Sequence, residues 1–198
     1  MLKFAISAAL AAATLVPSAA LAQNVPPAVI AVVDLERVQA ECTACKSARA
    51  ALQTQANAIK ARETALTTPL QTEGKAIQAA IDALKGAEPD AALQARVKAF
   101  ETKRQQGAQE LANRTQQFQR NQAYVAQQIQ AKLGPIYQQV MQRRGANVMV
   151  EIGNTLASGA ALDVTNDVLA ALNQQLPSVA TTAPAQAAAP AQQTPQGR

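Results

Sequence analysis

Cys42 and Cys45 are the residues best suited to covalent chemistry, because thiols three positions apart can form a disulfide or hold a metal ion. The sequence has two cysteines and no histidine, so a single chain cannot complete a zinc site from the usual ligands. A thioredoxin-like role would need the pair in a strand–helix–strand setting, which the surrounding residues do not predict. Three interpretations stay open: a local disulfide at the start of a helix, two small apolar residues in a packed face, and redox or intermolecular metal chemistry.

The rest of the composition argues against catalysis. Without histidine there is no histidine general base and no triad built on one, and no other pattern predicts a catalytic site. Only 3% of the 198 residues are aromatic, so the side chains that dominate most hydrophobic cores are scarce and a thick core is not expected. We therefore expect a protein that is not an enzyme and that needs no cofactor.

Positive charge is concentrated in the second half of the central region. The formal net charge is +5, and between residues 96 and 144 nine basic side chains face only Glu101 and Glu110. Any one of these cations taken alone is most simply a solvated side chain. As a set, the excess favours an anionic partner such as an acidic polypeptide or lipid head groups. The candidate contacts for a client polypeptide are Arg96, Lys98, Lys103, Arg104, Arg114 and Arg120.

The N-terminus has the features of an export signal. Lys3 precedes an apolar run, and Ala20-Leu21-Ala22 is a small-x-small cleavage site, which predicts a signal peptide at residues 1–22 and a mature start at Gln23. The apolar run is shorter than the ~20 residues that a helix needs to cross a bilayer, although an uncleaved anchor is the alternative. An exported protein whose helical region lacks aromatic platforms for stacking bases is not expected to bind nucleic acid.

Short strands are expected on both sides of the central region. Residues 29–33 form a β-branched run that predicts a strand buried on both faces, and residues 147–152 alternate as in a second strand. Residues 155–164 could hold a third strand. Thr165 is expected to cap a short closing helix that runs to Leu176.

Residues 35–144 show only helical signals. Apolar residues recur every seven positions in two series, a spacing that keeps one narrow stripe against a partner helix: Val38, Cys45, Leu52, Ile59 and Leu66, then Leu111, Phe118 and Val125. Turn-forming residues at 86–90 separate the two series. The pattern predicts two long arms in an antiparallel helical hairpin with its tip near residues 86–90.

The two strands can pair only if the hairpin leaves the sheet and returns beside it. The expected fold class is therefore α+β: residues 28–34 and 145–177 form a β-body with its closing helix, and residues 35–144 form the arms. The β-body is too small to stabilise a separate domain, so we expect it to be oligomeric. The candidate contacts between subunits are Ile30, Val32, Val148 and Val150. Residues 178–198, rich in Ala, Pro and Gln, are expected to be a disordered tail.

Three stretches of the sequence resemble the Skp/OmpH family of periplasmic chaperones. They are Ile30-Ala31-Val32-Val33-Asp34 ahead of a helix, Val148-Met149-Val150 near the end, and residues 162–173. The last stretch, which contains Asp163-Val164-Thr165, is similar to the family's D-[VIL]-T-x-x-V-[IL] closing segment. The resemblance extends over roughly residues 28–176.

The resemblance implies a homotrimer shaped like a jellyfish, in which strands of three subunits form the β-body and three hairpins enclose a cavity. Members of this family hold unfolded outer-membrane proteins there without ATP, until delivery to the outer-membrane assembly machinery. The implied partners are unfolded outer-membrane proteins and further copies of the chain, and anionic lipid or lipopolysaccharide is also considered. The alternative is a periplasmic coiled-coil structural or adaptor protein, whose hairpin would sit between larger β-domains than this chain contains.

Overall fold

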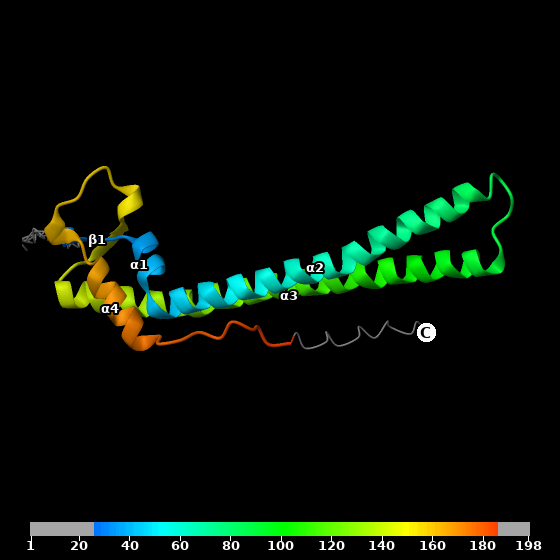
Figure 1. The fold of residues 1–198 in the computed structure, drawn as a ribbon. Helices are drawn as coiled ribbons and strands as arrows, with labels where there is room; N and C mark the ends of the chain where they lie inside the picture. Colours follow the sequence, from blue (N-terminus) through cyan, green and yellow to red (C-terminus); the bar gives the residue numbers. More distant parts are fainter. Residues whose placement is uncertain (1–25, 186–198) are drawn as a thin grey trace, which may run out of the picture.

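The structure is a computed structural model that describes residues 26–185 (Figure 1). The expected signal peptide at residues 1–22, the expected mature start at Gln23 and the end of the expected tail, residues 186–198, lie outside the described residues. Two long helices form a hairpin that projects to one side, and the shorter elements gather at the opposite end, here called the base.

The elements follow one another in the order strand, helices, strand, helix. They are β1 (Ile30–Val33), α1 (Leu35–Glu41), α2 (Thr43–Ala83), α3 (Ala91–Arg144), β2 (Val148–Glu151), the 3-10 turns η1 (Ile152–Asn154) and η2 (Ala160–Leu162), and α4 (Thr165–Gln175). The arms are α2 with 41 residues and α3 with 54 residues. The helical interpretation of the central region is confirmed, and both arms continue through their internal prolines, Pro69 and Pro135.

The arms begin and end at residues whose chemistry suits those positions. Asp90 caps α3, because its carboxylate accepts a hydrogen bond of 2.7 Å from the amide of Leu93. Gly145 ends α3 in the left-handed region, with a φ of 65° that glycine adopts without strain. The connection between the arms covers residues 84–90 and includes Gly86, whose φ is 95°.

The first arm is interrupted near the base, where the sequence pattern suggested one continuous helix. Cys42 has an extended backbone that ends α1 and begins α2. Its sulfur accepts a hydrogen bond of 3.0 Å from the amide of Cys45, and the side chain of Asn173 accepts one of 2.8 Å from the amide of Thr43. The free amides of the first turn of α2 are thus satisfied by a local sulfur and by a residue of α4.

The two strands form a parallel pair in which Ile30 lies opposite Val148. This pairing is the one expected, and the whole hairpin serves as its crossover. A third strand over residues 155–164 does not form, because this stretch contains the turn η2 and pairs with β1 only at an isolated bridge between Val32 and Asp163. The strand β1 is also less buried than expected, since Ile30 is 42% exposed.

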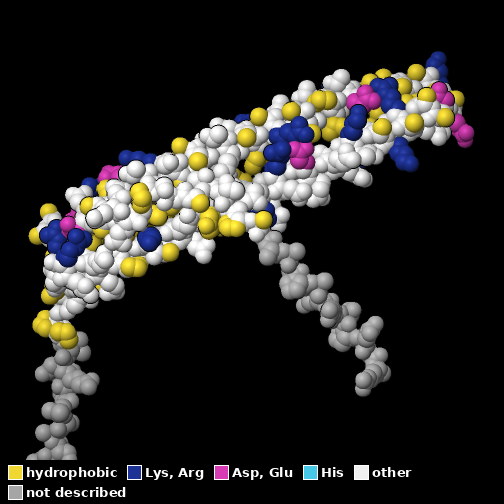
Figure 2. All heavy atoms as spheres, turned by 90° about the horizontal axis from the view of Figure 1, so that it is seen from below, with side chains coloured by type: hydrophobic (Ala, Val, Ile, Leu, Met, Phe, Trp, Pro, Cys, Tyr) yellow, Lys and Arg dark blue, Asp and Glu magenta, His cyan; other side chains and the backbone are white. Residues whose placement is uncertain are grey.

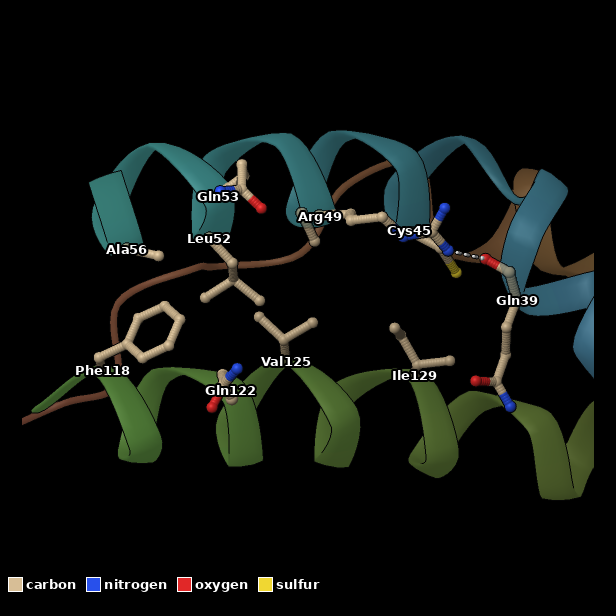
Figure 3. A pocket seen from close by; sticks show the side chains of 11 residues that line it. Gln39, Cys45, Arg49, Leu52, Gln53, Ala56, Phe118, Gln122, Val125 and Ile129 are labelled. Atoms are coloured by element: carbon tan, nitrogen blue, oxygen red, sulfur yellow. Dashed lines mark hydrogen bonds between the residues drawn. The ribbon is translucent and has the colours of Figure 1, made fainter. Parts of the chain in front are cut away.

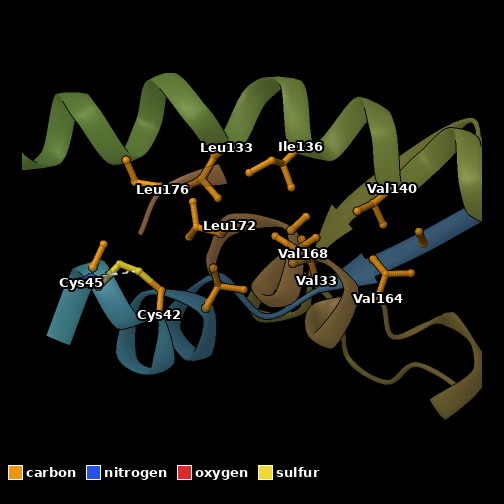
Figure 4. Packing of buried hydrophobic residues seen from close by; sticks show 14 residues of the cluster. Val33, Cys42, Cys45, Leu133, Ile136, Val140, Val164, Val168, Leu172 and Leu176 are labelled. Atoms are coloured by element: carbon orange, nitrogen blue, oxygen red, sulfur yellow. Dashed lines mark hydrogen bonds between the residues drawn. A yellow bond between two sulfur atoms is a disulfide. The ribbon is translucent and has the colours of Figure 1, made fainter. Parts of the chain in front are cut away.

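The hydrophobic core lies at the base, between the end of α3, the helices α1 and α4, and β1 (Figure 4). Its largest fully buried apolar side chains come from α1, α3 and α4: Val38, Leu133, Ile136, Val140, Val168 and Leu172. Thr165, expected as the cap of α4, is instead its first residue. Its buried hydroxyl accepts a hydrogen bond of 2.9 Å from the amide of Asp34, which ties α4 to the end of β1.

The first eight residues of the expected disordered tail have a defined structure. Residues 178–185, which we call the strap, leave α4 and run along the hairpin toward its tip (Figure 1). Val179 packs against the core at the base, and Ala180, Thr181 and Ala183 form hydrogen bonds with side chains of both arms. Composition alone could not predict that the strap is ordered, because the side chains that bind it belong to Gln55, Asn121 and Gln128, which are far away in the sequence.

Candidate functional site

The groove between the arms has a shallow apolar hollow near the base, with a volume of about 310 Å³. Leu52 from α2 lies over Phe118 and Val125 from α3, Ile129 lies farther along the groove on the side of Cys45, and glutamine and alanine side chains complete the lining (Figure 3). Arg49 lies at its edge, where its guanidinium donates to the carbonyl of Gln39 over 3.3 Å. The hollow offers apolar contacts of modest size and no group with the geometry of a catalyst.

A second hollow, of about 440 Å³, lies farther toward the tip. Leu66, Pro69 and Leu70 form its apolar part, and its charged residues are Arg62, Glu73, Lys103 and Glu110. The arms approach closely here because Gly107 of α3 faces the side chain of Leu66.

Ion pairs between the arms border this second hollow. Glu110 accepts hydrogen bonds from the guanidinium groups of Arg62, at 2.8 and 2.9 Å, and of Arg114, at 2.8 Å. These hydrogen bonds lower the pKa of Glu110 to about 2, and those from Arg62 have the largest effect. Glu73 is bound by Arg96 at 2.7 and 3.0 Å, which lowers the pKa of Glu73 and raises that of Arg96.

The six predicted client cations are therefore not equally available. Arg96, Arg104 and Arg114 pair with the carboxylates of Glu73, Glu101 and Glu110. Arg120 is half-buried and donates to the side-chain oxygen of Gln117. Lys98 and Lys103 are exposed and form no salt bridge within residues 26–185. Figure 2 accordingly shows basic and acidic side chains next to each other along the arms.

The four predicted subunit contacts differ in how exposed they are. Ile30 and Val148 are opposite each other in the sheet and are 42% and 39% exposed. Val150 is half-buried. Val32 does not fit the prediction, because it is 2% exposed and covered by residues of its own chain near Asp163. Other large apolar side chains exposed at the base are Val29, Ile152, Leu156 and Leu162.

The structure joins Cys42 and Cys45 in a disulfide, with their Cα atoms 5.1 Å apart. Both residues are also part of the hydrophobic core, with exposed fractions of 0% and 6%. Two of the three interpretations of this pair therefore describe the same arrangement: the bridge is local and it is packed. Within residues 26–185 no three Cys, Asp or Glu side chains gather where they could hold a metal ion.

Sequence reasoning missed a group of side-chain amides, here called the amide cluster, formed by Gln55 of α2 and Gln117, Asn121 and Gln128 of α3. Asn121 is 5% exposed although it is polar. The sequence did indicate that Asn121 would be buried. It lies three residues after Phe118 and four before Val125, and so falls on the apolar stripe of the second arm.

Comparison with known proteins identifies the fold. Residues 29–172 match the family model of OmpH-like outer membrane proteins. The chain belongs to the OmpH-like family. A crystal structure of an OmpH-like protein from Caulobacter crescentus, proposed to be an outer membrane chaperone, is similar with a TM-score of 0.64 and 22% sequence identity. The similarity covers 78% of this chain and 90% of the other, and it shows that the two share a fold.

The search of curated proteins finds no match to this OmpH-like chain. Among the described helices, none combines the length and hydropathy of a membrane-spanning segment. The assignment to the OmpH-like family rests on the family model, and the fold shared with the Caulobacter crescentus protein supports it.

Proposed function

We propose that this protein is an ATP-independent holdase chaperone of the periplasm, which binds unfolded outer-membrane proteins and keeps them soluble for assembly. The observation that carries the proposal is the pair of long arms in an OmpH-like chain, whose groove offers shallow hollows without a deep pocket. A holdase must bind many sequences weakly and release them without an energy source. Small apolar contacts bordered by amides and ion pairs suit that requirement.

The proposal includes a homotrimer with three hairpins around a cavity. A two-stranded sheet of four residues per strand is too small to be stable by itself. At the base, Ile30, Val148 and their exposed apolar neighbours would become buried if strands of several subunits packed together. The arms would then extend from a common centre and surround a client.

Electrostatic attraction contributes to capture in this proposal. Of the predicted cations without a salt bridge among the described residues, Lys98 and Lys103 are the exposed ones, and both are on the tip half of α3. They would attract clients of net negative charge, and salt would screen the attraction over about 10 Å at 0.1 M. Raising the salt concentration should slow the capture of acidic clients. Capture rates that do not depend on salt would remove this part of the proposal.

The decisive experiment dilutes a urea-unfolded outer-membrane β-barrel protein into buffer and follows its aggregation by light scattering. We expect aggregation to fall in proportion to added chaperone, without nucleotide, until three chains are present per client. Serum albumin at equal mass is the control for nonspecific protection. Aggregation that stays as fast with a threefold molar excess of trimer as with albumin would refute the holdase proposal.

A further inference from the structure

The strap is held in place through its main chain. Gln128 forms two hydrogen bonds with one residue, because its amide nitrogen donates to the carbonyl of Ala180 over 2.8 Å and its oxygen accepts from the Ala180 amide over 3.0 Å. Gln55 donates to the carbonyl of Thr181 over 3.0 Å. Asn121 accepts from the amide of Ala183 over 2.9 Å. Four main-chain groups are thus bound within four consecutive residues.

The side chains that bind the strap form a network across the two arms. Gln117 donates to Asn121 over 2.8 Å, and Asn121 donates to Gln55 over 2.8 Å. Each amide side chain has a donor and an acceptor, so the cluster can bind both the N–H and the C=O groups of a peptide. The four amides are uncharged, and the guanidinium of Arg120 donates to Gln117, which forms no hydrogen bond with the strap, so the bonds to the peptide itself come from neutral groups.

The side chains of the strap contribute little to this recognition. In the described part of the chain, every hydrogen bond between the strap and the arms uses a main-chain group of the strap. Two of the three bound residues are alanines, and Val179 is the one apolar side chain that packs against the core. Peptide recognition through main-chain hydrogen bonds gives affinity without selecting a sequence.

We propose that the amide cluster is a binding site for extended polypeptide main chain, and that the strap occupies this site in competition with an unfolded client. This inference rests on the holdase function proposed above and adds a mechanism to it. A client segment in extended conformation replaces the strap and takes over its four hydrogen bonds. When the client leaves, the strap returns, since its attachment to α4 keeps it close to the site.

The strap therefore weakens client binding by a predictable factor. If the strap occupies the site about 90% of the time, only one chain in ten is competent, and the apparent dissociation constant rises about tenfold. Competition of this kind promotes release without ATP. The expected cost is a lower affinity, which a holdase that must transfer its clients can tolerate.

The test measures binding of a fluorescein-labelled peptide that copies residues 178–189 of the sequence, by fluorescence anisotropy. The full chain is compared with a chain that ends at Val179, which keeps the apolar anchor. A second variant, A180P/A183P, removes the two strap amides that donate to the cluster and leaves the arms unchanged. We expect both variants to bind the peptide about tenfold more tightly than the full chain.

Two further comparisons test recognition of the main chain. In the A180P/A183P background, Q128A should weaken peptide binding about fivefold, whereas Q109A, an exposed glutamine elsewhere on α3, should not change it. A peptide with N-methylalanine at the position of Ala180 should also bind about fivefold more weakly. A peptide of the same composition in scrambled order should retain its affinity if its proline stays in place.

The outcomes separate this inference from the holdase function. If all chains suppress aggregation but strap removal changes neither peptide nor client affinity, the holdase function stands and the inference is overturned. If no chain suppresses aggregation but the strap variants bind peptide more tightly, the competition is supported and the holdase proposal fails. Circular dichroism establishes that each variant is folded. If the chain ending at Val179 is unfolded, A180P/A183P decides the outcome.

Discussion

Cys42 separates two helices within a single residue, and its sulfur has two roles there. The sulfur accepts the amide of Cys45 as a helix cap, and it is bonded to the sulfur of that same residue. The short bridge fixes the first turn of α2, and the side chain of Asn173 in α4 binds this turn by accepting a hydrogen bond from the amide of Thr43. The cysteines act here through structure and lie within the hydrophobic core.

Replacing both cysteines tests this structural role. We expect C42A/C45A to lower the free energy of unfolding by about 2 kcal/mol, because a bridge over a very short loop removes little entropy from the unfolded chain. Urea denaturation measures the change, and suppression of client aggregation should be unaltered. Loss of client protection in a variant that is still folded would instead support a redox role for the pair.

Leu172 is the residue through which α4 contributes most to the core, since it is large and 0% exposed. We expect L172A to destabilise the protein by about 2–5 kcal/mol, because the cavity would be only partly refilled. I81A is the control, since Ile81 is 39% exposed at the tip end of α2, outside the core and the proposed subunit contacts, and its loss should change stability by less than about 1 kcal/mol. Equal effects of the two substitutions in urea denaturation would contradict the location of the core.

At the scale of the elements, the close approach of the arms at Gly107 has a measurable consequence. A Cβ atom added at Gly107 would lie 3.8 Å from Leu66, an ordinary contact distance, so alanine fits there. Because alanine favours a helix interior over glycine, G107A should stabilise the protein by up to about 1 kcal/mol. G86A is the contrast, since Gly86 has a φ of 95° and alanine would be strained. The melting temperatures of G107A and G86A, measured by circular dichroism, are compared with that of the wild type, and only G107A should melt at a higher temperature.

The ion pairs between the arms make their stability dependent on pH. Glu110 has a pKa of about 2 in the folded protein, below the value of about 4.3 expected when it is unfolded. Its contribution is therefore complete above about pH 4.3 and is lost as the pH falls toward 2. Glu73, whose pKa is also lowered, changes in the same direction.

We expect the difference in melting temperature between the wild type and E110Q to be present at pH 7 and to shrink between pH 5 and pH 2. Glu88 forms no salt bridge among the described residues, so E88Q should differ little from the wild type at either pH. A difference for E110Q that stays constant down to pH 2 would show that the pairs with Arg62 and Arg114 do not stabilise the arms.

The helices and the strand pair could be predicted from the sequence because their signals are local. A repeat of seven residues describes the stripe from Leu111 to Val125 without any knowledge of the partner helix. The turn residues near Gly86 and the β-branched run before Asp34 are equally local signals. These patterns together were sufficient for the hairpin and for the pairing of β1 with β2, whereas the parallel orientation of the pair is known from the structure.

The features that the sequence could not predict depend on how the two arms align and on contacts between residues far apart in the sequence. Arg96 is neutralised by Glu73 only because the arms align these positions, which no count of charges shows. The burial of Val32 depends on the loop around Asp163, and the order of the strap depends on Gln55 and Asn121. Each of these contacts joins residues more than twenty positions apart.

At the scale of the whole molecule, the apolar surface at the base is the feature that calls for a partner. Ile30 and Val148 expose more than a third of their surface although they belong to the only sheet within residues 26–185. In the proposed trimer this surface is covered by the same surface of other subunits. Removing it should separate the subunits and leave each hairpin intact.

We expect I30D/V148D to shift the protein from trimer to monomer, because a buried charge without a partner is strongly unfavourable. Light scattering on a size-exclusion column measures the mass, and circular dichroism checks that the helices remain. I81D is the matched control, since Ile81 is 39% exposed but lies near the tip. A wild type that is a compact monomer at micromolar concentration would contradict the trimer before any variant is made.

The parallel strand pair also determines the order in which the molecule can fold. Val29 and Asn147 are hydrogen-bonded although 118 positions separate them. Contacts of such high contact order form late, since the chain between them must first become compact. If the chain is exported through a membrane channel N-terminus first, as proposed, β1 waits unpaired until both arms have crossed. In the proposed trimer, assembly would be postponed until each subunit is complete, and a nascent fragment would not recruit finished neighbours.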